Sequence, residues 1–124
     1  MYSNDDIMQF VNIVVELVDP DKIVLFGSYA YGKPDNKSDI DLLVVKNGKD
    51  FSFDDEVVLD TKLFRLRKEH NIGVHYDIFF RTEHQINEVM KNGGSFVIII
   101  KGNDDYYVAK PNFYKTKSSY FEKN

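Results

Sequence analysis

The chain has 124 residues, 43% of them hydrophobic and 15% aromatic, which is enough apolar material for one folded domain with a core. Its net charge of −4 at pH 7 argues against a long nucleic acid as the main partner, because such partners are held by basic residues. Cysteine is absent, so disulfides, thiol nucleophiles and cysteine-based zinc sites are excluded, and a reducing cytoplasm is the expected compartment. Neither a secretory signal nor a membrane span is expected, since the N-terminus is acidic and the longest apolar runs, such as 96–100, are short.

The first half of the chain shows one helical pattern and two strand-like runs. Apolar residues recur at helical spacing after the Asp5-Asp6 pair, and Pro20 ends that pattern. Two short runs rich in β-forming residues follow, separated by a stretch that contains glycine and proline. The predicted elements are a helix from about residue 3 to 18, a buried strand at 23–26, a loop with or without a helical turn at 27–38, and a strand at 39–45.

The second half predicts two more helices and two more strands. An acidic start at Asp54 and a basic end around Lys68 match the dipole of a helix. Thr82 and Gln85 resemble a capping box at the start of the following helix. The predicted elements are a helix from about residue 54 to 70, a strand at 74–80, a short helix from Thr82 to the Gly93-Gly94 pair, and a strand at 95–101.

This pattern divides the chain into a folded domain at residues 1–102 and a C-terminal tail at 103–124. The tail is polar but carries six aromatic residues, too many for a plain disordered segment. We therefore expect it to dock on the domain or on a partner. The aromatic residues of the tail are Tyr106, Tyr107, Phe113, Tyr114, Tyr120 and Phe121.

Two aspartates lie in the otherwise apolar strand at 39–45. Side chains alternate along a strand, so Asp39 and Asp41 share a face, where burying unpaired charges is costly. Mg²⁺ removes that cost, because it prefers one or two carboxylates together with water and substrate phosphates. Asp77 is the only acid of the next strand and completes a three-carboxylate cluster if the two strands are neighbours. Two metal ions could then assist phosphoryl transfer, with Asp77 also accepting a proton. The plainer alternative is an edge strand with polar residues facing solvent.

Gly27 and Ser28 directly follow the strand at 23–26. A helical turn after a strand presents free backbone N–H groups, which bind phosphate. Gly27 allows a close approach of the chain to the phosphates, and the Ser28 hydroxyl can donate to a phosphate oxygen. An ordinary turn or cap is the alternative for Ser28. The Asp-x-Asp that follows strengthens the phosphate interpretation.

Together these residues form a recognisable signature. GSYAYG…SDIDLLV resembles the signature of the DNA polymerase β-type nucleotidyltransferase superfamily, and specifically its minimal nucleotidyltransferase (MNT) branch. The resemblance covers roughly residues 5–101 and includes INEVMKNGG, which is similar to the last helix of these domains. Tyr31 stands where the family often has arginine, and a phenol does not supply that positive charge. The matching residues are Gly27, Ser28, Ala30, Gly32, Ser38, Asp39, Ile40, Asp41, Leu42 and Asp77.

The resemblance implies a nucleotidyltransferase fold of the α/β (α+β) class, with a small mixed β-sheet flanked by helices. It also implies two Mg²⁺ ions and transfer of a nucleoside monophosphate from ATP or another NTP to a hydroxyl. By the family pattern, Gly27 and Ser28 would bind the nucleotide, and Asp39, Asp41 and Asp77 would be the catalytic, metal-binding residues.

The size of the chain limits the classes of acceptor that we expect. Template-directed polymerases of the superfamily need further domains for primer and template, and antibiotic-modifying members usually carry an extra helical region. Stand-alone proteins that resemble this chain are commonly encoded beside a HEPN ribonuclease toxin and transfer AMP from ATP to a tyrosine of that toxin. We therefore expect a Mg²⁺-dependent protein adenylyltransferase acting as the antitoxin of a HEPN-type partner. The alternatives are a small-molecule (antibiotic-type) nucleotidyltransferase and a non-catalytic, partner-binding antitoxin module; a homo-oligomer is also left open.

Overall fold

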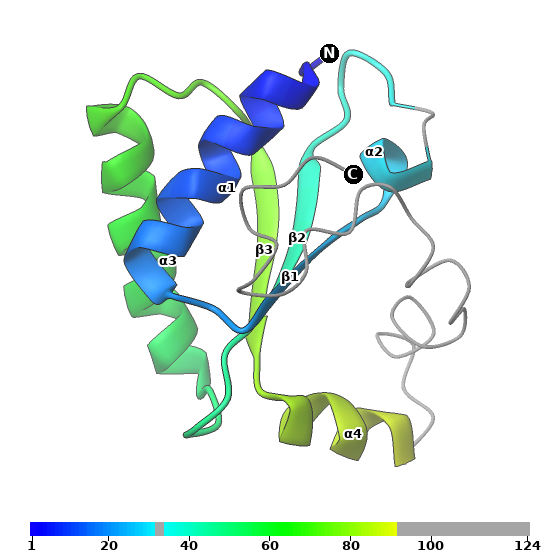
Figure 1. Ribbon diagram of the computed structural model, residues 1–124, viewed down its shortest axis with the longest axis vertical. Helices are drawn as coiled ribbons and strands as arrows, with labels where there is room; N and C mark the ends of the chain where they lie inside the picture. The colour runs from blue at the N-terminus through cyan, green and yellow to red at the C-terminus, as the bar shows by residue number, and fades with distance from the viewer. Residues whose placement is uncertain (32–33, 92–124) are drawn as a thin grey trace.

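The computed structural model describes residues 1–31 and 34–91, which form a small mixed sheet flanked by helices (Figure 1). The strand order is β1-β2-β3, with β1 antiparallel and β3 parallel to β2. This confirms the predicted fold class. The elements are α1 (Asn4–Val18), β1 (Lys22–Phe26), α2 (Ser28–Tyr31), β2 (Ile40–Val45), α3 (Phe53–Glu69), β3 (Tyr76–Arg81) and α4 (Glu83–Lys91). The predicted strand at 95–101, the Gly93-Gly94 helix end and the aromatic tail lie outside the described residues.

Helix α1 begins and ends as its sequence predicts. The Ser3 hydroxyl accepts a hydrogen bond from the Asp6 N–H, and the Asp6 carboxylate accepts one from the Ser3 N–H, so the two residues form a capping box. At the other end, Asp19 adopts a left-handed conformation and its N–H donates to the Val15 carbonyl oxygen at 2.9 Å. Pro20 follows at once and cannot continue the helix.

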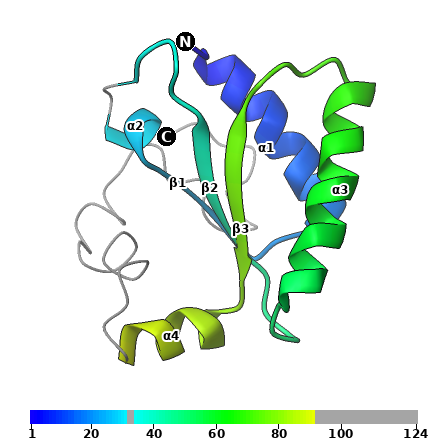
Figure 2. The same ribbon diagram turned by 180° about the vertical axis from the view of Figure 1, so that it is seen from behind.

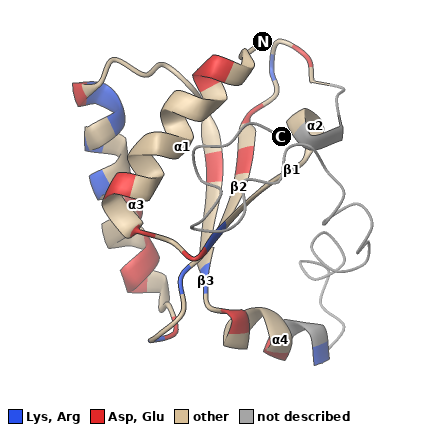
Figure 3. Ribbon diagram, viewed as in Figure 1, with Lys and Arg blue, Asp and Glu red and all other residues tan. Residues whose placement is uncertain are grey.

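Helix α3 has a second capping box, in which Ser52 caps the helix and Asp55 closes the box. The helix therefore begins at Phe53, one residue earlier than predicted. Figure 3 shows acidic residues gathered in its first turn and basic residues in its last. This polarity matches the helix dipole, as expected from the sequence.

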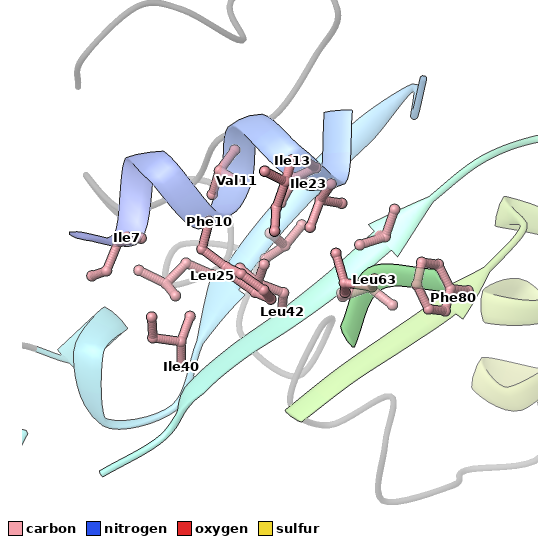
Figure 4. Close-up of a cluster of buried hydrophobic side chains, with 14 of the residues drawn as sticks. Ile7, Phe10, Val11, Ile13, Ile23, Leu25, Ile40, Leu42, Leu63 and Phe80 are labelled. Atoms are coloured by element: carbon pink, nitrogen blue, oxygen red, sulfur yellow. The ribbon is translucent and has the colours of Figure 1, made fainter. Parts of the chain in front are cut away.

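Part of the hydrophobic core lies between α1 and one face of the sheet (Figure 4), and β2 is buried on both faces except at Asp41. Leu42 of β2 is fully buried, and the Phe10 ring of α1 lies 4.7 Å from the Tyr76 ring of β3, measured between centroids. Leu63 is the buried residue of α3 and joins the same cluster. The largest fully buried side chains are Phe10, Phe80, Ile23, Leu25, Ile40, Leu42, Leu43, Leu63, Val11, Val14, Val24 and Val44.

Helix α4 is attached to the loop between β2 and α3 at the far end of β3 (Figure 2). The Gln85 side chain bonds both the N–H and the carbonyl oxygen of Phe51. Thr82 and Gln85 exchange side-chain and backbone hydrogen bonds, which confirms the predicted capping box. Asp50 accepts hydrogen bonds from Thr82 and His84, so this loop is fixed by several contacts.

All three strands differ at an end from the sequence prediction, and β1 begins at Lys22, one residue earlier than predicted. Strand β2 begins at Ile40 and not at Asp39, and β3 runs Tyr76–Arg81 in place of the predicted 74–80. The Ile40 N–H donates to the His75 carbonyl oxygen at 3.0 Å, and the first residue pair of the parallel ladder is Ile40 with Tyr76. Asp39 and residues 74–75 therefore precede the ladder. No helix among the described residues is long and apolar enough to span a membrane.

Candidate active site

The parallel pairing of β2 and β3 brings two of the predicted carboxylates together. Asp41 and Asp77 are direct partners in the register, so their side chains project from the same face of the sheet. Their neighbours Leu42 and Ile78 point to the opposite face, toward α1. Figure 3 shows the acidic segments of β2 and β3 side by side. The alternation of side chains along each strand predicted that each acid lies on the face opposite its apolar neighbours. The register confirms that the two strands are neighbours.

The environment of Asp41 disfavours its ionised form. The pKa of Asp41 is raised to about 6, first by burial and then by the charge of Asp77, a hydrogen bond with the Asp77 side chain and the charge of Asp39. Two carboxylates in hydrogen-bond contact need either a shared proton or a cation between them. A cation that binds between Asp41 and Asp77 is therefore stabilised by both carboxylates.

Asp39 lies just before β2 and is half-buried. It is close enough for its charge to act on the pKa of Asp41. No three His, Cys, Asp or Glu side chains within residues 1–31 and 34–91 are grouped closely enough to hold a metal ion. The structure thus shows a carboxylate pair with a third charge nearby, and the assignment of Asp39, Asp41 and Asp77 as metal ligands stays a prediction.

Gly27 has a structural role that the sequence did not reveal. Its φ of +75° is a conformation that side-chain-bearing residues rarely adopt. A Cβ atom at this position would lie 2.0 Å from Oδ2 of Asp41, a distance that no real contact allows. The absence of a side chain at Gly27 therefore makes room for the Asp41 carboxylate.

Ser28 is the first residue of α2 and directly follows Gly27, so it is placed near the carboxylate pair. It is half-buried, and its hydroxyl makes no hydrogen bond to another described side chain. The proposed phosphate contact of Ser28 stays a prediction. Gly32, also part of the signature, lies outside the described residues.

Two tyrosines that the sequence analysis did not single out connect α2 to the start of β3. The Tyr2 N–H donates to the Tyr29 hydroxyl at 2.9 Å, and the Tyr2 hydroxyl accepts from the His75 N–H at 2.8 Å. The two rings stack with centroids 5.8 Å apart. Tyr29 belongs to α2, and His75 is two residues before Asp77. Residues so far apart in the chain carry no local sequence signal of such a connection.

The comparison with protein families decides the identity of the domain. The family profile described as nucleotidyltransferase domain matches residues 7–101, well over half of the chain. The chain belongs to the nucleotidyltransferase domain family. It is therefore a transferase domain for nucleotidyl groups, and the matched region contains the three described strands with Gly27 and the three aspartates. The comparison with curated proteins found no match.

Nucleotidyltransferases generally use a nucleoside triphosphate and a divalent metal, and the residues of this domain fit such a cation. Carboxylate oxygens are the ligands that Mg²⁺ prefers, and the Asp41–Asp77 pair offers them where a positive charge relieves repulsion. Asp77 is exposed and Asp41 half-buried, so solvent and substrate can reach the pair from the side of Asp77.

Proposed function

We propose that this nucleotidyltransferase domain transfers AMP from ATP to a hydroxyl of a protein partner in a Mg²⁺-dependent reaction. The partner we propose is a HEPN-type toxin modified on a tyrosine, so that the chain acts as its antitoxin. The observation that carries the catalytic part of the proposal is the contact between Asp41 and Asp77 across neighbouring strands.

Each residue of the proposed site has a separate task. Asp39, Asp41 and Asp77 would hold Mg²⁺, and the bound cation would supply charge neutralisation at the triphosphate. Asp77, the exposed member of the pair, would accept the proton of the attacking hydroxyl. That oxygen attacks the α-phosphorus of ATP, a new phosphodiester bond forms, and pyrophosphate leaves. Gly27 and Ser28 would contact the triphosphate from the start of α2.

The protein acceptor is supported by the MNT-like signature and by the small size of the domain. Asp77 is exposed at the start of β3, where a hydroxyl on the surface of a protein partner can approach it. A tyrosine hydroxyl on a partner surface is an acceptor of this kind.

The test uses ATP labelled in the α-phosphate, Mg²⁺ and a purified HEPN-type candidate partner. Label on the partner is expected with α-labelled ATP and not with γ-labelled ATP, because AMP and not phosphate is transferred. Asp41→Asn and Asp77→Asn should abolish labelling. Glu16→Gln removes one exposed carboxylate on α1, away from the pair, and should label like wild type.

The same assay separates the alternatives. Label on an aminoglycoside or lincosamide, with none on the protein partner, would favour a small-molecule acceptor. If wild type gives no label and an Asp39→Asn/Asp41→Asn variant still neutralises the toxin, the chain acts by binding alone and the enzymatic proposal is wrong.

A further inference from the structure

Helix α3 exposes an unusual number of large apolar side chains. Phe53 is 79% exposed, Val58 is 52% exposed, and Val57 and Phe64 are 47% and 44% exposed. The helix packs on the domain through a different face, which contains the buried Leu63. Figures 1 and 2 both place α3 at the outer side of the molecule. Exposed large apolar residues that share one side of a helix, as Phe53, Val57 and Phe64 do, indicate an interaction surface.

Three of the four exposed large apolar residues of α3 form a stripe along the helix, whereas Val58 lies about 100° around the helix from Val57. Phe53, Val57 and Phe64 are separated by four and seven positions, which places them on one side of an α-helix. Asp60 and Lys68 continue the same spacing, so the stripe extends over about 22 Å. The Lys68 ammonium lies 4.7 Å from the centre of the Phe64 ring, so the basic end of the stripe already stacks on its aromatic residue.

The charges beside the stripe are divided between the two ends of the helix. Asp54 is exposed in the first turn, while Arg65 and Lys68 are exposed near the last; Glu69 is also exposed there, but by its spacing it lies on another side of the helix. The other acids of the first half have partners within the domain: Asp55 closes the capping box, Glu56 pairs with Arg81, and Asp60 accepts from Tyr76.

The stripe and the charges beside it match the same surface of a second copy when the two α3 helices run in opposite directions. If two copies of α3 pack antiparallel about the point between Asp60 and Thr61, residues at equal distances from that point lie opposite each other. Val57 then faces Phe64 of the second copy, and Phe53 faces the stem of Lys68. Along the axis of the helix pair, Asp54 lies between Arg65 and Lys68 of the second copy, so opposite charges are close together at both ends of the contact. A parallel arrangement would place like charges together.

We propose that the stripe formed by Phe53, Val57, Asp60, Phe64 and Lys68 docks a second copy of this chain, as an antiparallel α3–α3 pair. Such a contact is isologous: the same surface is used by both copies, and it closes at a dimer. The proposal depends on α3 alone and is independent of the reaction that the domain catalyses.

The first experiment measures mass by sedimentation equilibrium from low to high micromolar protein. A species of twice the 14.5 kDa chain mass is expected at the upper concentrations. Val57→Lys places a charge opposite Phe64 of the second copy and should weaken association at least about tenfold. Lys62→Glu changes an exposed residue of α3 outside the stripe and should associate like wild type. A chain that stays monomeric at every concentration, or a dimer that Val57→Lys leaves unchanged, overturns the proposal.

The second experiment tests the direction of packing by charge reversal. Asp54→Lys makes both exposed ends of α3 positive, and Arg65→Glu with Lys68→Glu makes both negative. Each variant alone should be monomeric, whereas a mixture of the two should form a heterodimer. The matched control, Lys37→Glu with Lys62→Glu, has the same change in net charge outside the stripe and should still self-associate. If the two reversed variants fail to pair although circular dichroism shows both folded, the antiparallel α3 contact is wrong.

Discussion

Asp41 and Leu42 are neighbours on β2, but their side chains lie in opposite environments. Leu42 is fully buried in the cluster between the sheet and α1, where its contacts are supplied by the protein itself. Asp41 lies on the other face against Asp77, and burial and like charge raise its pKa to about 6. The chain itself supplies the contacts of Leu42, whereas the carboxylate of Asp41 is stabilised when a cation binds.

This difference separates residues that stabilise the fold from residues that serve its chemistry. Removing an apolar group from the α1 face creates a cavity and lowers stability. Removing a charge from the acidic face relieves repulsion and raises the stability of the metal-free protein. Truncation of a buried apolar side chain and neutralisation of Asp41 should therefore change stability in opposite directions.

The largest effect is expected for Phe10→Ala on the apolar face. The ring is fully buried against Tyr76, so its loss should reduce the free energy of unfolding by about 3–5 kcal/mol. Urea denaturation followed by circular dichroism measures the change. Val58→Ala, at an exposed position of α3 outside the stripe, is the control and should change stability little. A Phe10→Ala loss as small as the control would contradict the proposed core.

Gly27→Ala tests the point where the chain passes closest to Asp41. The positive φ and the overlap with Oδ2 of Asp41 together should lower the free energy of unfolding by about 2 kcal/mol. Gly73→Ala is the matched control, because a Cβ there meets no atom within 4 Å. Combining Gly27→Ala with Asp41→Ala should recover the part of the loss that is due to overlap. Purely additive effects of the two substitutions would show that the carboxylate is not the obstacle.

Asp41→Asn is expected to raise stability and abolish activity at once. In the metal-free protein at pH 7, removal of the buried negative charge should add about 1–2 kcal/mol, a value reduced for partial solvent exposure. Nucleotidyl transfer should fall about a thousandfold, since the carboxylate would hold the cation. Denaturation in the presence of EDTA and the labelling assay measure the two effects, with Glu16→Gln as the control for both. A variant that loses stability as well as activity would show that Asp41 supports the fold.

The smallest effect is a pH dependence that belongs to the same carboxylate. Because the pKa of Asp41 is raised from 3.8 to about 6, the folded chain binds more protons than the unfolded chain between these values. The stability of the metal-free protein should therefore fall, relative to Asp41→Asn, by about 1 kcal/mol as pH rises through 6. The difference between wild type and variant in urea midpoint, measured from pH 4 to pH 7.5, tests this. A difference that stays constant over that range contradicts a raised pKa.

Local features of the fold were predictable because each depends on residues close in the chain. Ser3 with Asp6 and Thr82 with Gln85 form caps through side chains three residues apart, and Pro20 ends α1 by its own geometry. The strand limits at Ile40 and Tyr76 were missed, because they depend on where the parallel ladder starts. The alternation that places Asp41 and Asp77 on particular faces was likewise a local property.

The sequence by itself determined the order of helices and strands, the faces of the two acidic strands and the resemblance to nucleotidyltransferases. The tertiary structure decided that Asp41 and Asp77 are direct partners, because strand register is set by hydrogen bonds between distant segments. It also decided that Gly27 makes room for Asp41, and that Tyr2 connects Tyr29 with the start of β3. These contacts join residues far apart in the chain, and only packing of the whole domain brings such residues together.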